Sequence, residues 1–96
     1  MPHLTWSPPA LRDVARLHAF LLTKNKDAAI RAAKAMRQSF KLLGTHPVAG
    51  RPAEALPHEF REWPINFGDS GYLALYRCDG QHVIILAVRH TKELDY

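Results

Sequence analysis

Six residues that carry a charge or a titratable proton lie at the ends of predicted strands in the second half of the chain. They are Arg61, Arg77, Arg89, His90, Lys92 and Tyr96. Guanidinium groups bind phosphates through paired N–H donors, and a histidine or tyrosine can move a proton. Metal-independent RNA cleavage needs a base, cations at the scissile phosphate and an acid for the leaving oxygen. The alternative is a set of scattered surface cations, with Arg61 and Arg77 paired to nearby carboxylates.

The first half of the chain holds most of the positive charge. Residues 8–43 contain eight basic side chains opposed only by Asp13 and Asp27, whereas residues 44–96 contain more acidic than basic ones. Such asymmetry favours an acidic or polyanionic partner, although a solvated helix face has the same composition. We therefore consider these residues as candidates for binding: Arg31, Lys34, Arg37, Lys41, Arg51, Arg61 and Lys92.

Several common sites are excluded by the residues present. The sequence contains no glycine-rich phosphate loop, no G-x-S-x-G and no H-E-x-x-H. Its six histidines lack ligand spacing, and Cys78 has no second cysteine with which to form a disulfide or a zinc site. We expect no metal and no cofactor, and we interpret Cys78 as a packing residue.

Two helices are predicted to follow a short strand at residues 3–6. Ser7 is placed to cap a first helix that ends near Leu22, and Asn25 or Asp27 can cap a second helix that ends at Leu43. Gly44 suits a left-handed residue that closes it. The first helix has an apolar stripe of Leu11, Val14, Leu17/His18 and Leu21, and the expected buried line of the second is Ala29, Ala32/Ala33, Met36, Phe40 and Leu43.

The remaining chain is predicted to form a loop and three strands. Residues 45–57 contain three prolines and read as a loop, residues 60–67 and 72–78 alternate as strands, and residues 82–89 form the last one. Pro64 places its strand at an edge or a bulge, and residues 68–71 and Asp79-Gly80 are turns. The apolar run at residues 83–88 indicates a central strand covered on both faces or the best-buried position of the sheet. We predict one α+β domain over residues 1–96, with β-α-α-β-β-β order and a helical hairpin packed on a mostly antiparallel four-stranded sheet.

Four segments together resemble the RelE/ParE superfamily of bacterial toxins. They are P-x-x-G-R at residues 47–51, F-R-E-W-P-I at 60–65, G-Y-L-A-L-Y-R at 71–77 and I-I-L-A-V-R-H at 84–90. The resemblance covers nearly the whole chain. It implies a toxin of a two-gene toxin–antitoxin or plasmid stabilisation module, bound by an antitoxin with an acidic or amphipathic segment in a hetero-oligomer.

The superfamily contains two mechanisms. RelE-like members resemble ribosome-dependent mRNA endoribonucleases, or mRNA interferases, and ParE-like members resemble DNA gyrase inhibitors without chemistry of their own. Nuclease members commonly have an arginine where this chain has Leu73, which favours the ParE-like side. Under the nuclease alternative, Arg77, Arg89 and His90 are the candidate catalytic residues. A third hypothesis is a small basic nucleic-acid-binding module.

The same features indicate where the protein works. No apolar run approaches the roughly 20 residues that cross a bilayer, and the first residues lack the basic flank and apolar stretch of a secretion signal. We expect a cytoplasmic protein that does not act at a membrane.

Overall fold

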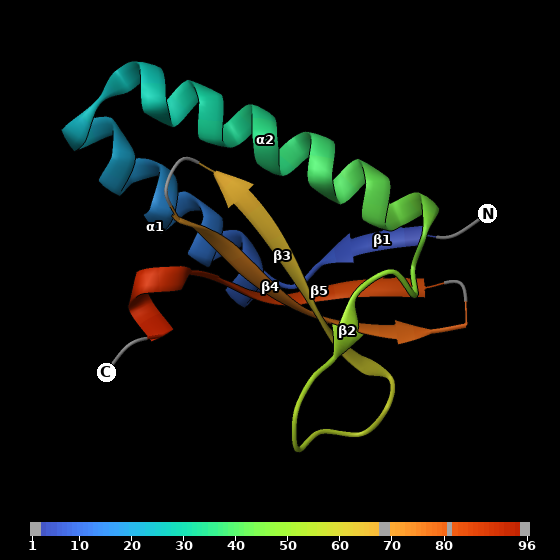
Figure 1. Cartoon of the computed structure of the whole chain (residues 1–96). Helices are drawn as coiled ribbons and strands as arrows, with labels where there is room; N and C mark the ends of the chain where they lie inside the picture. Colours follow the sequence, from blue (N-terminus) through green and yellow to red (C-terminus); the bar gives the residue numbers. More distant parts are fainter. Residues whose placement is uncertain (1–2, 68–69, 81, 95–96) are drawn as a thin grey trace.

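The computed structural model describes residues 3–67, 70–80 and 82–94. Its elements are β1 (His3–Trp6), α1 (Pro8–Lys24), α2 (Lys26–Thr45), β2 (Arg51–Pro52), β3 (Phe60–Phe67), β4 (Ser70–Asp79), β5 (His82–His90) and a final 3-10 turn, η1 (Thr91–Leu94). Figure 1 shows the two helices lying together on one side of a twisted sheet. The predicted α+β class with a helical hairpin on a mostly antiparallel sheet is confirmed.

Two short polar side chains set the helix boundaries. Ser7 caps α1, because its Oγ accepts a hydrogen bond from the Ala10 N–H at 3.2 Å. Asn25 serves both helices: its backbone N–H donates to the Leu21 carbonyl at 2.8 Å, and its Oδ1 accepts from the Ala28 N–H at 3.1 Å. One residue therefore ends α1 and begins α2, which keeps the hairpin connection short.

The predicted buried line of α2 is largely confirmed. Its buried residues are Ala29, Ala32, Met36, Phe40 and Leu43. The apolar stripe predicted for α1 is wrong at its start, since Leu11 is 54% exposed. Ala10 occupies the buried position instead, because it lies seven residues before the buried Leu17 and therefore on the same face of the helix.

The end of α2 also differs from prediction, because Gly44 lies inside the helix. The helix continues to Thr45, and His46 follows with an extended φ of −125°. The Thr45 hydroxyl donates to the Lys41 carbonyl at 3.2 Å, and the His46 N–H donates to the Leu42 carbonyl at 3.0 Å. Since these bonds satisfy terminal carbonyls, no left-handed residue is needed to close the helix.

The sheet has five strands in the order β1-β5-β4-β3-β2, one more than predicted. The additional strand, β2, pairs Arg51 with Glu62 and Pro52 with Arg61 inside the segment predicted as a loop. β1 pairs with β5 in parallel and the other neighbours are antiparallel. β5 is internal and its Val83, Ile85 and Val88 are fully buried, although β4 and not β5 is the central strand. The strand of Pro64 is not an edge strand, since β3 lies between β4 and β2. β2 pairs only with Arg61 and Glu62, however, so Pro64 itself lies on an open edge.

The turns are only partly covered by the described residues. Residues 68, 69 and 81 lie outside them, whereas Ser70 and Gly71 belong to β4, which begins earlier than predicted. Gly80 has a positive φ of 61°, as expected for the predicted Asp79-Gly80 turn. At the other end of the β4–β5 ladder, the start of β4 and the end of β5 lie beside α1.

The core lies between the helices and the covered face of the sheet. Trp6 packs edge-on against Phe40 with ring centroids 4.6 Å apart, and Trp63 Nε1 donates to Ser39 Oγ at 2.7 Å. Between β4 and β5, Leu75 pairs with Ala87 and Tyr76 pairs with Ile85. Leu86 of β5 therefore has no partner and forms a bulge. This bulge changes which residues of the last strand face the helices.

Candidate functional site

The loop at residues 47–51 is fastened to the sheet by a buried tyrosine. Tyr76 is 0% exposed, and its hydroxyl accepts from the Gly50 N–H at 3.0 Å and donates to the Pro47 carbonyl at 2.8 Å. Arg61 Nη1 donates to the Gly50 carbonyl at 2.8 Å. Arg51 pairs with Glu62, with Nε and Oε1 3.1 Å apart. These contacts therefore hold the loop on the sheet, and one N–H group of Arg61 is engaged in them.

Burial raises the pKa of Tyr76 above 10.0, while the hydrogen bond from Gly50 and the charge of Arg61 partly oppose the rise. Because the folded-state pKa is raised, the neutral phenol contributes stability that is present below about pH 10 and lost above it. We expect the stability advantage of the wild type over Tyr76→Phe to shrink as the pH rises from about 8 to about 11. Urea unfolding of both proteins measures this difference, and a constant gap over that range would contradict the assignment.

The three candidate catalytic residues are not brought together. Arg77 lies opposite Ile84, and Arg89 lies opposite Leu73, four residues away along β4 or about 13 Å at strand rise. Arg77 Nη2 is 3.8 Å from Asp79 Oδ2. His90 follows Arg89 and therefore points to the other face of the sheet. Its ring packs edge-on against the buried Tyr72, with centroids 5.3 Å apart. Tyr96, the other predicted proton carrier, lies outside the described residues.

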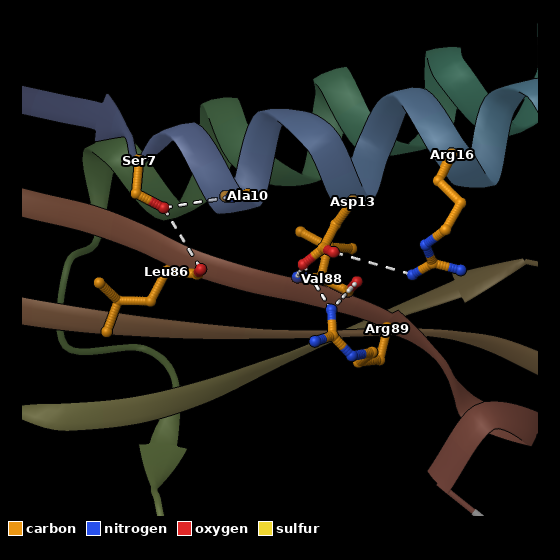
Figure 2. A network of polar contacts seen from close by, with 7 residues as sticks. All are labelled: Ser7, Ala10, Asp13, Arg16, Leu86, Val88 and Arg89. Carbon is orange, nitrogen blue, oxygen red and sulfur yellow. Dashed lines mark hydrogen bonds and ion pairs between the residues drawn. The ribbon is translucent and has the colours of Figure 1, made fainter.

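Arg89 is held by a carboxylate that sequence reasoning did not assign to a site (Figure 2). Asp13, on α1, accepts hydrogen bonds through Oδ2 from Arg89 Nη1 and from the Val88 N–H, the latter at 2.9 Å. Its Oδ1 is 3.8 Å from Arg16 Nη2. One carboxylate thus contacts two guanidinium groups and a buried strand.

The start of α1 continues the edge of the sheet where β1 stops. β1 pairs with β5 only up to Ile85, and the Ser7 N–H then donates to the Ile85 carbonyl at 3.0 Å. Ser7 Oγ donates to the Leu86 carbonyl at 3.3 Å, and Asp13 accepts from Val88. Side chains of α1 therefore satisfy backbone groups that a strand would otherwise pair. The only sequence feature that indicates this contact between α1 and β5 is Asp13, an acidic residue within a basic helix.

Two of the grooves that border the helices are lined by both apolar side chains and cations. The first, of about 630 Å³, has an apolar wall of Leu17, Phe20, Leu21 and Tyr72 and a polar rim of Arg16, His90 and Lys92. The second, of about 560 Å³, lies between α2 and β1, and Arg37 and Lys41 border its apolar floor of Leu4, Trp6, Val14, Ala33, Met36, Phe40 and Gly44. Both grooves combine apolar walls with cations, as suits an amphipathic anionic ligand.

The predicted binding cations divide into two groups. Arg51 and Arg61 are engaged in the loop contacts above, whereas Lys92 lies on the rim of the first groove. The other four lie exposed along α2, and within the described residues none of them makes an ion pair: Arg31, Lys34, Arg37 and Lys41. α2 is therefore the part of the molecule with the most available positive charge.

In residues 3–67, 70–80 and 82–94, no three His, Cys, Asp or Glu side chains gather in a way that could hold a metal ion. Within the same ranges, no helix is long and apolar enough to cross a membrane.

The helical hairpin packs on a five-stranded sheet, and cations lie on α2 and at the ends of the strands. This is a toxin fold of the RelE/ParE type. The family model described as the ParE toxin of the type II toxin–antitoxin system parDE matches residues 4–95. The chain belongs to this family, so the predicted superfamily is confirmed.

Individual relatives agree with this membership. The chain is 31% identical over 93 residues to Toxin RelE3 of Caulobacter vibrioides, covering 97% of this chain and 98% of that protein. The fold is similar to a chromosomal ParDE system of P. aeruginosa, with a TM-score of 0.77 and 22% identity over 94% of this chain and 96% of that one. It is also similar to the toxin–antitoxin complex RelBE2 of Mycobacterium tuberculosis, with a TM-score of 0.61 and 24% identity over 94% and 99% of the two chains.

Proposed function

We propose that this type II toxin acts as a ParE-like growth inhibitor in the cytoplasm by binding a target such as DNA gyrase. The observation that carries the proposal is the separation of Arg77, Arg89 and His90. Arg77 and Arg89 lie about 13 Å apart along the sheet, and His90 points to its other face. Acid–base catalysis on a phosphate needs these groups within hydrogen-bonding reach of one substrate.

The middle strand supports the same mechanism. Leu73 stands opposite Arg89, at the position where the resemblance to nuclease members would place an arginine. A leucine cannot donate to a phosphate oxygen, and the loss of one such donor costs about 3 kcal/mol of transition-state stabilisation. Arg89 does not replace it freely, because one of its amino groups is bonded to Asp13.

An antitoxin with an acidic amphipathic segment would complement the second groove. Its apolar side chains would enter between Trp6, Met36 and Phe40, and its carboxylates would reach Arg37 and Lys41. Binding only the folded toxin, such a segment would also stabilise this small domain. The expected assembly is a hetero-oligomer of toxin and antitoxin.

Induced expression in a bacterial host tests the proposal, with plasmid supercoiling and messenger integrity measured from the same culture. We expect growth to stop with altered supercoiling, while messenger RNA on the ribosome stays intact at early times. Cleaved messenger with unchanged supercoiling would contradict it. Co-expression of the short reading frame next to the toxin gene is expected to restore growth.

The second candidate is a ribosome-dependent mRNA endoribonuclease, and the first groove favours it. That groove places His90, a possible proton carrier, on one rim with Arg16 and Lys92. The variant His90→Gln separates the two mechanisms, provided that its thermal unfolding matches the wild type. We expect it to remain toxic, whereas a nuclease that uses His90 would lose activity by a factor of about 100 or more.

A further inference from the structure

Four cations form one exposed face of α2. Arg31, Lys34, Arg37 and Lys41 follow one another at steps of three or four residues, so they lie on the same side of the helix over about 15 Å. We call this set the α2 cationic face. Figure 1 shows α2 along the top of the molecule with no element above it, and all four side chains are exposed. The face is therefore open to a large partner.

No ion pair neutralises this face within the described part of the chain. The one acidic residue of α2 is Asp27, one turn before Arg31. Asp13, Glu62 and Asp79 pair with cations outside the face. Four cations against one carboxylate on this side of the helix produce a positive local field.

The shape and chemistry of the face favour a phosphate backbone. Its central positions are Arg31, Lys34, Arg37, Gln38 and Lys41, all of them long and polar. The one aromatic residue of α2, Phe40, is buried on the opposite side. Binding of single-stranded nucleic acid relies on exposed aromatic side chains that stack on bases, and this face has none. The exposed apolar side chains of α2, Ile30 and Leu42, lie at the two ends of this face, so its middle offers a protein partner no apolar anchor.

We infer that the α2 cationic face binds the phosphate backbone of duplex DNA without sequence preference. About 15 Å of duplex carries roughly nine phosphate charges, which is more than enough to engage all four cations at once. The contact needs no groove and no base recognition. The toxin would then bind DNA of any sequence beside its protein target. This binding can be measured on DNA alone, whatever that target is.

The salt dependence of DNA binding tests this inference. Fluorescence anisotropy of a labelled 20-base-pair duplex is measured with the full-length toxin between about 50 and 200 mM salt. With four phosphate contacts, affinity is expected to fall about 100-fold over this range, because each contact contributes roughly 0.9 to the slope of log K against log salt. Arg31→Gln/Lys34→Gln is expected to lower the slope by about 1.8, so that its affinity falls only about tenfold.

The control removes the same number of charges from α1. Arg12 and Lys24 are exposed near opposite ends of that helix, and neither belongs to the α2 cationic face. Arg12→Gln/Lys24→Gln is expected to retain the full 100-fold salt dependence, with both variants melting at the wild-type temperature.

Four results would overturn the inference. The first is an unchanged slope in the α2 variant, and the second is an equal loss in the α1 control, which would indicate a general charge effect. The third is tighter binding of a poly-glutamate peptide than of duplex at the same salt, lost in the α2 variant, which would make this a surface for acidic proteins. Preference for the single strand of the same sequence over the duplex would likewise reject duplex DNA as the partner.

Discussion

Asp13→Ala is expected to lower the free energy of unfolding by about 2 kcal/mol, mainly because it leaves the Val88 N–H without a partner. Val88 is 0% exposed, so water cannot replace the lost carboxylate easily. The ion pair with Arg89 adds less, since the Arg89 side chain is 42% exposed and solvent screens its charge. For a domain of this size the expected fall in melting temperature is about 10 °C.

Urea unfolding of a small set of variants checks this assignment. Arg89→Ala keeps the bond from Val88 to Asp13 and is expected to cost about 1 kcal/mol or less. Asp13→Asn retains a carbonyl oxygen as acceptor and should lie between the two. Glu54→Ala removes the same charge from an exposed loop position and should leave stability within about 0.5 kcal/mol of wild type. If Arg89→Ala were as costly as Asp13→Ala, the guanidinium and not the backbone of β5 would be the main partner of Asp13.

The helices could be predicted closely because their signals are local. Ser7 and Asn25 bond to backbone groups three residues away, and the alanine line of α2 repeats with the period of a helix. Strand β2 could not be predicted, since Arg51 and Pro52 are strand residues only through pairing with Glu62 and Arg61. A two-residue segment that contains a proline has no sequence pattern that identifies this pairing partner.

The candidate site was harder to predict because one bulge decides the faces of the last strand. Val83 and Ile85 face the helices, and simple alternation from them would put Arg89 on the covered face and His90 on the open one. The bulge at Leu86 reverses this, so Val88 is buried and His90 packs against Tyr72. Arg89 and His90, as neighbours in a strand, point to opposite faces in either case, and the bulge decides that Arg89 and not His90 shares the open face with Arg77. The bond from Asp13 to Arg89 joins residues 76 positions apart and has no local signal.

Gly50→Ala is expected to be the most damaging of the conservative substitutions considered, with a loss of about 3 kcal/mol. A Cβ on Gly50 would lie 2.5 Å from the Tyr76 hydroxyl and 2.7 Å from the Glu62 carbonyl oxygen. Neither can move freely, because Tyr76 is buried and bonded to Pro47, and Glu62 is paired on both sides in the sheet. The loop must shift away, and the contact from Arg61 to Gly50 is strained with it.

The chain offers a matched control in Gly44→Ala. A Cβ there would be 3.9 Å from Leu4, an ordinary contact distance, and Gly44 lies within α2. Because alanine favours helix over glycine by up to about 1 kcal/mol, this variant is expected to be neutral or more stable than wild type. Two glycine-to-alanine changes six positions apart should thus have opposite signs in the same urea experiment.

A double-mutant cycle with Tyr76→Phe identifies the source of the Gly50 effect. Removing the hydroxyl takes away the 2.5 Å contact but leaves the Glu62 carbonyl oxygen and the ring carbon Cε1 at position 76, both 2.7 Å away, so the clash is relieved only in part. We expect Gly50→Ala to cost at least about 1 kcal/mol less in the Tyr76→Phe background than in the wild type. Strictly additive effects would mean that the strain comes from the Glu62 carbonyl and the aromatic ring, and not from the hydroxyl. In that case the tyrosine would hold the loop only through its hydrogen bonds to Gly50 and Pro47.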